Sequence, residues 1–296
     1  MIREQRGQPA SLTRAYARLL GNELMPARGG ALEADAYPLH CHAPVEIQRE
    51  RVEAYRRICQ LPSSGHFPAL YPQIAAMPLH LQLLSTPGLP GRSLGVVHLG
   101  QTVRWHRPMG PVEERMNLSA TLRPGPGHVR GQVFYMQTEW QDSDGIAIWE
   151  GESLLLFRGV DAGSDEMARL PPDTPETPEG ALELDIDCPA GLGRSYARVS
   201  GDWNPIHLSS MSARLFGFQC PIVHGMWTLA RALGEIERLR PQGGDFSGRQ
   251  LEAWFTAPLF WPGSTCLHVS PDGDWFQVDR DRKRRRPALW GQLQSF

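Results

Sequence analysis

The stretch "GMWTLARALGEIER", residues 225–238, predicts a long apolar helix. Its large apolar residues repeat at helical spacing and would share one face: Met226, Leu229, Leu233 and Ile236. At the standard rise the helix would be about 21 Å long, and Pro241 would end it. Alternating segments typical of half-buried strands surround it: "LELDID" (182–187), "LEAWFTA" (251–257), "CLHVS" (266–270) and "WFQVD" (275–279). This pattern predicts an α+β fold in which an antiparallel sheet wraps the helix.

The first half of the chain repeats this order of elements. An apolar segment, "IAAMPLHLQLL" (74–84), predicts a helix, and four strands should follow: 95–105, 117–123, 129–140 and 151–159. Three residue pairs are separated by the same 149 positions: Pro72 and Pro221, Met77 and Met226, Trp105 and Trp254. The common spacing and the common order indicate a duplicated domain.

A segment without large apolar clusters separates the two halves. Residues 161–180, "DAGSDEMARLPPDTPETPEG", hold four prolines and several acids, a composition that cannot bury itself. We therefore expect a first domain over 1–160, a linker over 161–180 and a second domain over 181–296.

Composition narrows the class of protein. The chain has 296 residues and a formal net charge of −2, which gives no reason to expect a nucleic-acid partner. The five cysteines are widely spaced and form no CxxC pair, which favours reduced thiols over a disulfide framework or a zinc site. No apolar run is long enough to span a bilayer, and the first residues lack the apolar core of a signal peptide. The sequence thus predicts a soluble, cytoplasmic protein.

Three short motifs have simpler explanations than a catalytic or binding site. "GRSLG" (91–95) fits the G-x-S-x-G pattern, but a strand follows it rather than precedes it, so Ser93 is not expected to be a nucleophile. "HCH" (40–42) lacks a placed third metal ligand and is interpreted as a turn before the helix "APVEIQRERVEAYRRI" (43–58). "RDRKRRR" (280–286) is interpreted first as a solvated hairpin tip; the alternative is that Arg284 and Arg285 contact the phosphates of a cofactor arm or an acidic carrier protein.

Polar groups of three kinds gather in "GDWNPIH", residues 201–207: the carboxyl of Asp202, the amide of Asn204 and the imidazole of His207. A surface turn would account for the acid, the amide and the proline between them. It would not account for the sequence that follows, in which Ser209 or Ser210 can cap a short helix and Gly217 can end it. The chain then returns to the long helix, whose first turn contains Gly225 and presents backbone N–H groups without partners.

The segment from 190 to 235 resembles the MaoC-like, or type 2 (R)-specific enoyl-CoA hydratase, family. The family motif is an aromatic residue, then S/T-G-D-x-N-P-[LIV]-H, then a small residue after a further five. The matching positions are Tyr196, Ser200, Gly201, Asp202, Asn204, Pro205, Ile206, His207 and Ala213. In the first half the resemblance is one of architecture only.

The resemblance implies a double hot-dog fold and the reversible syn addition of water to a trans-2-enoyl thioester, giving an (R)-3-hydroxyacyl thioester. It implies Asp202 and His207 as the catalytic pair and leaves open which is acid and which is base. Asn204 and Ser200 would orient them, and the Gly225 amide would hold the thioester oxygen. Tyr196 and Met226 are further expected substrate contacts. No metal and no cofactor is expected, because coenzyme A or acyl carrier protein is part of the substrate.

The first half lacks the catalytic motif, with Ala75 where His224 stands and Ala76 where Gly225 stands. We expect this half to accommodate the acyl chain, with Ala75 and Ala76 at the substrate, and the assembly to be a homodimer of double hot dogs. Two alternatives stay open: a hot-dog acyl thioesterase, although 226–233 contain no acid, and a non-catalytic acyl-thioester binding subunit.

Overall fold

A computed structural model describes residues 3–5, 12–24, 36–63, 66–111, 115–161, 167–240, 245–280 and 286–296. Within these ranges the strands form one sheet with the order β1-β2-β4-β5-β6-β3-β8-β11-β10-β9-β7. Apart from the parallel pair β1–β2, neighbouring strands are antiparallel. The strands are β1 (Arg3–Gln5), β2 (Leu39–Glu46), β3 (Val97–Trp105), β4 (Arg115–His128), β5 (Gly131–Gln141), β6 (Ala147–Arg158), β7 (Leu182–Cys188), β8 (Arg249–Phe255), β9 (Gly263–Val269), β10 (Trp275–Asp279) and β11 (Pro287–Ser295).

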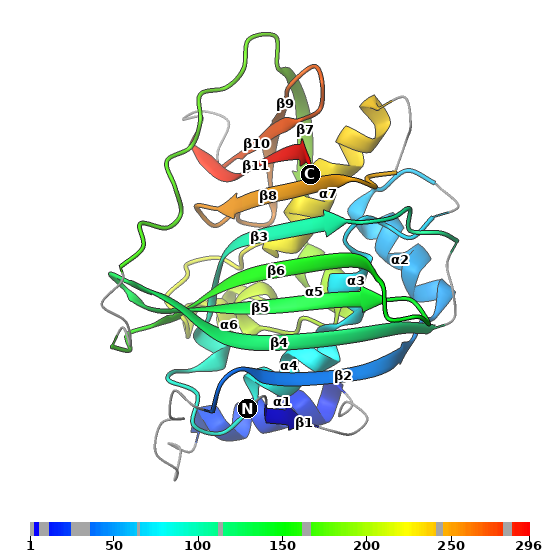
Figure 1. Ribbon diagram of the computed structural model, residues 1–296. Helices are drawn as coiled ribbons and strands as arrows, with labels where there is room; N and C mark the ends of the chain where they lie inside the picture. Colours follow the sequence, from blue (N-terminus) through cyan, green and yellow to red (C-terminus); the bar gives the residue numbers. More distant parts are fainter. Residues whose placement is uncertain are drawn as a thin grey trace.

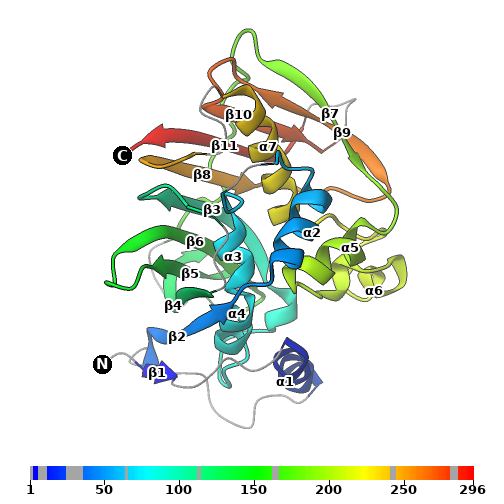
Figure 2. The same cartoon turned by 90° about the vertical axis from the view of Figure 1, so that its right-hand side faces the viewer.

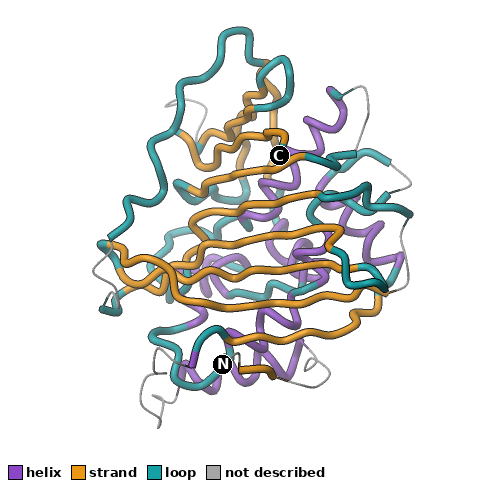
Figure 3. The backbone as a smooth tube through the Cα atoms, viewed as in Figure 1, coloured by secondary structure: helices purple, strands orange, loops and turns teal. Residues whose placement is uncertain are grey.

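The α-helices lie on one side of this sheet (Figures 1 and 2). They are α1 (Leu12–Leu24), α2 (Arg49–Cys59), α3 (Tyr71–Ala75), α4 (Met77–Leu84), α5 (Leu192–Ser200), α6 (Ser210–Arg214) and α7 (Gly225–Leu239), with 3-10 turns η2 (Ser93–Gly95) and η3 (Pro205–His207). Figure 3 shows the sheet as one curved surface around the helices. The predicted α+β architecture is confirmed.

Strands β3 and β8 join the two half-sheets at the centre of the molecule. Val103 lies opposite Leu251, and both side chains are fully buried in the main core on the helix side of the sheet. The two halves therefore form one continuous structure, and helix α7, buried along most of its length, begins beside their junction.

The long helix predicted over 225–238 is confirmed as α7. The first-half helix predicted over 74–84 is wrong as a single element: α3 ends at Ala75, Ala76 separates the helices, and α4 begins at Met77. Pro78 explains the break, because a proline lacks the N–H that a continuous helix would use to bond the carbonyl four residues before it.

The 149-residue equivalence of Trp105 and Trp254 is also wrong. Trp105 belongs to the main core and donates its indole N–H to Ala69 O. Trp254 belongs to a separate cluster with Leu99 and donates to Glu252. Successive residues of a strand face opposite sides of the sheet. An odd offset such as 149 between the paired strands β3 and β8 therefore matches a residue on one face of the sheet with a residue on the other face.

The segment "HCH" does not form a turn. Residues 40–42 belong to β2, paired with β4, with Cys41 buried and His42 exposed. Helix α2 consequently begins at Arg49 rather than near Ala43. Alternation of buried Leu39, Cys41 and Ala43 was the strand signal in this segment.

Residues 167–180 of the predicted linker run along the molecule without helix or extended strand (Figure 1). Its first residues touch the turn between β4 and β5, where His128 Nε2–H donates to Leu170 O over 3.0 Å. No helix in the described ranges is long and apolar enough to cross a membrane.

Candidate active site

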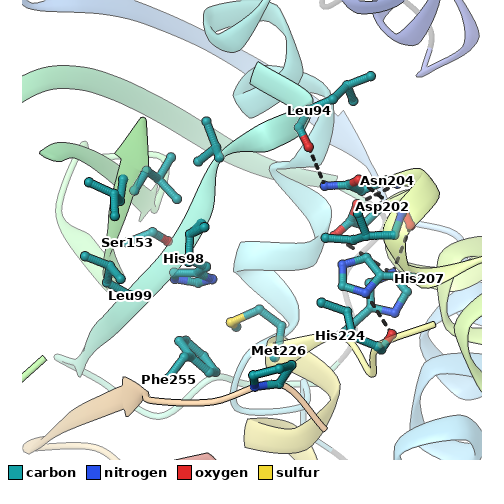
Figure 4. A pocket seen from close by; sticks show the side chains of 18 of the residues that line it. Leu94, His98, Leu99, Ser153, Asp202, Asn204, His207, His224, Met226 and Phe255 are labelled. Atoms are coloured by element: carbon teal, nitrogen blue, oxygen red, sulfur yellow. Dashed lines mark hydrogen bonds and ion pairs between the residues drawn. The ribbon is translucent and has the colours of Figure 1, made fainter. Parts of the chain in front are cut away.

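A cavity of about 510 Å³ lies between the two halves (Figure 4). Both halves contribute to its lining, from α1, α3, α4, β3 and β6 on one side and from the 200–207 segment, the start of α7 and β8 on the other. The residues that the sequence singled out at Asp202, Asn204, His207, Ser200, Gly225, Tyr196 and Met226 all line it.

Local geometry brings Asp202 into this cavity. Gly201 ends α5 with φ +80°, a left-handed backbone conformation that favours glycine, and an added Cβ would meet Leu12 at 2.9 Å. Behind the turn, the fully buried Ser200 accepts the Asp202 N–H through Oγ at 3.1 Å. The chain reversal therefore directs the carboxyl inward, where its side chain keeps 32% exposure.

The Asp202 carboxylate is held by two donors through Oδ1. The Asn204 N–H donates over 3.1 Å and the Tyr16 hydroxyl over 3.5 Å. Burial alone would raise the pKa of this carboxyl, but the imidazoles of His224 and His207 and these hydrogen bonds together lower it. Asp202 is therefore ionised at neutral pH.

His207, 8% exposed, presents one nitrogen to the protein and the other to the cavity region. Its Nδ1 lies 2.9 Å from Ile222 O, an acceptor, so Nδ1 carries the hydrogen and Nε2 carries the lone pair. Burial lowers the pKa of His207, against the opposing influence of Asp202 and of the Ile222 carbonyl. The neutral imidazole is thus poised to accept a proton at Nε2.

His224 stacks on His207 with ring centroids 3.8 Å apart and an interplanar angle of 24°. It precedes α7 as its N-cap and donates Nε2–H to the backbone oxygen of Asp202 over 3.1 Å. Burial, then the proximity of His207, lowers the pKa of His224 to about 3, so it remains uncharged. It couples the start of α7 to the turn that carries the acid.

Asn204 braces the turn rather than the imidazole. Its Oδ1 accepts the Ile206 N–H over 3.4 Å and caps η3, and its Nδ2 donates to Leu94 O in the other half over 3.4 Å. The predicted short helix after it is confirmed: Ser209 caps α6 by accepting the Ser212 N–H, and Gly217 follows at φ +85°.

Gly225 is the first residue of α7, so its N–H lies in the first turn and has no acceptor within the helix. A Cβ at this position would meet the Phe255 ring at 2.8 Å. A glycine here permits Phe255 to approach the helix N-terminus, and Gly225 itself lines the cavity.

Two of the predicted substrate contacts do not line the cavity. Ala75 and Ala76 are buried, but Ile74 and Met77 line the cavity instead. Matching the two halves residue by residue therefore does not identify the first-half residues that line the cavity. Arg284 and Arg285 lie outside the described residues. Ser93 lines the cavity from η2, but its Oγ–H donates to Leu84 O and it does not sit on a strand-to-helix elbow.

Three functional candidates were missed from the sequence. Tyr16 reaches Asp202 across 186 positions of chain, and no local pattern signals this contact. His98 lines the cavity from β3. His224 could have been predicted from the sequence, because it is a histidine directly before the glycine that begins a helix.

Asp202, His207 and His224 are close enough together to hold a metal ion, since one ligand atom of each lies within 4.8 Å of the others. Each imidazole donates one N–H to a carbonyl, His224 Nε2–H to Asp202 O and His207 Nδ1–H to Ile222 O. This leaves a lone pair on His207 Nε2 and on the buried His224 Nδ1, and either could take part in proton transfer or hold a metal ion.

Comparison with known proteins agrees with this geometry. Residues 182–265 match the family described as MaoC like domain. The chain is 29% identical over 251 residues to 3-hydroxyacyl-thioester dehydratase X of Mycobacterium tuberculosis, covering 84% of this chain and 86% of that one. A stretch of 70 residues, 24% of this chain and 22% of the relative, is 36% identical to peroxisomal enoyl-CoA hydratase 2 of Arabidopsis thaliana.

Solved structures show the same fold. The crystal structure of HtdX from Mycobacterium tuberculosis superposes with a TM-score of 0.68 at 23% identity, over 87% of this chain and all of that one. A second Mycobacterium tuberculosis protein, described as having a double hotdog fold, superposes with a TM-score of 0.51 at 13% identity, over 90% and 98% of the two chains. The fold is a double hot dog. The domain that matches the MaoC-like family lies in the second half of the chain.

Proposed function

We propose that this protein is a hydro-lyase that adds water reversibly to trans-2-enoyl thioesters and forms (R)-3-hydroxyacyl thioesters. The observation that carries the proposal is the free Nε2 of a neutral His207 beside the ionised Asp202 at a cavity between the halves. The two relatives named as a 3-hydroxyacyl-thioester dehydratase and an enoyl-CoA hydratase support it.

In the proposed reaction, a water bound between Asp202 and His207 loses a proton to His207 Nε2 as its oxygen bonds to C3. The electron pair of the C2–C3 double bond moves toward the thioester carbonyl. The Gly225 N–H stabilises the enolate oxygen at the positive end of α7. His207 then returns the proton to C2 and the carbonyl re-forms. Because one base serves one face, water and proton add syn.

The helices and sheet of the first half would accommodate the acyl chain in this proposal, with Ile74, Met77 and Leu81 among the apolar lining. The activated carrier is coenzyme A or acyl carrier protein, and no further cofactor takes part. Two different activities remain as alternatives, thioester hydrolysis and binding without catalysis. The acids of α7, Glu235 and Glu237, do not line the cavity, which disfavours the first.

The test is a spectrophotometric assay with crotonyl-CoA and longer trans-2-enoyl-CoA esters, with chiral analysis of the product and a parallel sample dialysed against EDTA. We expect loss of the enoyl absorbance, a product of R configuration and equal rates with and without EDTA. Release of free coenzyme A as the main product would support the thioesterase. Binding without turnover would support the non-catalytic subunit.

A further inference from the structure

A polar cluster lies on the sheet face that points away from the helices, at the end formed by β10, β9 and β7 (Figure 1). Residues of β9 alternate between the two faces: Leu267 and Val269 belong to the main core, so Cys266 and His268 point to the other side. Cys266 and His268 are nonetheless buried, at 6% and 2% exposure. Neither residue lines the cavity between the halves, so the cluster is separate from the candidate active site.

The register of the sheet brings a carboxylate from the neighbouring strand to this pair. Glu183 of β7 lies directly opposite His268 of β9, and Glu183 Oε1 is 3.7 Å from His268 Nδ1. One ligand atom from each of Glu183, Cys266 and His268 lies within 4.8 Å of the others. The Glu183 side chain keeps 52% exposure, so an ion can reach the cluster from solvent.

The other nitrogen of His268 contacts a buried acid. His268 Nε2 is 2.9 Å from Asp279 Oδ2, and Gln277 Nε2 donates to Asp279 Oδ1 over 2.8 Å. Asp279 is 1% exposed, and its carboxylate oxygens accept, so His268 Nε2 carries a hydrogen. In the neutral ring the lone pair is then on Nδ1, the nitrogen that faces Glu183.

A lone pair and a carboxylate oxygen that face each other repel unless a cation lies between them. The cation is either a second proton on His268 or a metal ion shared with Cys266. The 3.7 Å between His268 Nδ1 and Glu183 Oε1 is longer than a direct hydrogen bond of about 2.7 to 3.2 Å. It is close to the separation of about 3.4 Å that a nitrogen and an oxygen have as ligands of one tetrahedral zinc ion.

The chemistry of the three side chains also favours a metal ion. Thiolate, imidazole and carboxylate are the three ligand types that zinc takes in proteins. A histidine that binds a metal commonly donates its other N–H to a carboxylate, as His268 does to Asp279. The contact between Asp279 and His268 therefore has the form of an outer partner that orients a ligand.

We propose that Glu183, Cys266 and His268 bind one zinc ion, with a water molecule as the fourth ligand. Zinc replaces the thiol hydrogen of Cys266, which leaves as a proton, and no electron is transferred. Among the described strands, β7 ends the sheet and pairs with β9 alone, so a metal ion held by both strands fastens this edge. The site is structural, and it does not depend on the proposed function.

Zinc binding by the full chain, freed of any affinity tag and stripped with EDTA, tests the site. Metal content is measured after titration with zinc chloride, together with the Tm and the rate of crotonyl-CoA hydration. We expect Asp279→Asn to weaken zinc binding about 10- to 100-fold, and Glu183→Gln, which removes a ligand, to weaken it at least as much. Zinc should raise the Tm by about 5 °C and leave the hydration rate unchanged.

Cobalt distinguishes this site from the candidate active site. Co²⁺ in place of zinc gives a thiolate-to-metal charge-transfer band only where a cysteine is a ligand, and the acid and the two imidazoles of the active site offer no sulfur. The band should be absent from Cys266→Ser and present in Cys188→Ser, a control at a buried cysteine of β7. Asp187→Asn, on the same strand and face as Glu183, is the control for Glu183→Gln.

A wild type that takes up no zinc and shows no cobalt band would overturn the site. So would a band that Cys266→Ser retains. The cation at His268 Nδ1 would then be the second proton of an imidazolium between Glu183 and Asp279. Zinc uptake that depends on Cys266, in a protein that hydrates no enoyl ester, would support the site and refute the proposed function alone. Circular dichroism checks folding, and the exposed Glu183 carries the test if Asp279→Asn does not fold.

Discussion

His207 Nδ1 lies 2.9 Å from the carbonyl oxygen of Ile222, and this contact determines which nitrogen can do chemistry. A carbonyl oxygen accepts only, so the imidazole hydrogen is on Nδ1 and the Nε2 lone pair is left for the substrate water. The stacked His224 is uncharged and adds no repulsion against a proton arriving at His207. The site is therefore arranged around one ionised acid and one neutral base.

This arrangement predicts the acid side of the pH profile. The pKa of His207 is lowered from its ordinary value of 6.5, so the base remains unprotonated through the neutral range. We expect kcat/KM for crotonyl-CoA hydration to be flat around pH 7 and to fall only at a pH below 6.5. Stopped-flow or steady-state measurement across this range checks it. A half-maximal rate above pH 7 would contradict a neutral His207 base.

Tyr16 should act as a positioning residue for Asp202. Its hydroxyl accepts the Trp203 N–H over 2.8 Å and donates to Asp202 Oδ1 over 3.5 Å, linking helix α1 to the catalytic turn. Tyr16→Phe removes both contacts, and we expect kcat to fall about tenfold with a smaller change in KM. Leu19→Met, on the same helix and the same cavity, is the control. A lower Tm with unchanged kcat would reduce Tyr16 to a structural role.

We expect the Gly225 N–H to stabilise the thioester oxygen, and the absence of a side chain to make room for the Phe255 ring. Gly225→Ala places a Cβ 2.8 Å from the Phe255 ring and should lower kcat by displacing it. In a Phe255→Val background the clash is relieved, and alanine keeps the N–H. We expect the double variant to match Phe255→Val within about threefold, because loss of an oxyanion donor would instead cost about 10² to 10³ in kcat.

Buried neutral histidines should make the protein lose stability in mild acid. His80 is 6% exposed, its Nε2 is 2.7 Å from Thr138 Oγ1, and burial lowers its pKa to about 4. The unfolded chain, with a pKa near 6.5, binds the proton more readily, so the stabilisation is complete above 6.5 and lost as pH falls toward 4.

For His80 this amounts to about 2 kcal/mol of unfolding free energy between about pH 7.5 and pH 5. His224, with its pKa lowered to about 3, should add a similar loss. Urea unfolding at the two pH values tests it, with His80→Leu/Thr138→Val as the matched variant. That variant should lose about 2 kcal/mol less than the wild type on acidification. An unchanged difference would show that His80 does not titrate on unfolding.

Much of the second half was predictable because its signals are local. The apolar spacing of residues 226–236 predicts α7, and the polar cluster from Asp202 to His207 predicts a site whose parts are neighbours in sequence. Serine and glycine set the bounds of α6 in the way that capping requires.

The remaining features depend on contacts between distant segments. Tyr16 and His98 enter the cavity through packing of α1 and β3, which no periodicity reveals. Three residue pairs at one spacing predict the duplication. One of them, Trp105 and Trp254, matches residues on opposite faces of the sheet, because the spacing between the paired strands β3 and β8 is odd. The same match predicts Ala75 and Ala76 at the substrate, and the apolar spacing of 74–84 predicts one helix although Pro78 breaks it.

The catalytic roles of Asp202 and His207 can be measured by single-turnover hydration of crotonyl-CoA with Asp202→Asn and His207→Gln. Both substitutions preserve approximate shape; His207→Gln removes the group that carries the proton, and Asp202→Asn removes the carboxylate that binds the attacking water. We predict that each lowers the rate by about 10² to 10⁴ relative to the wild type, with crotonyl-CoA binding retained within tenfold. Rates within threefold of the wild type for both folded variants would contradict these roles and place the chemistry elsewhere.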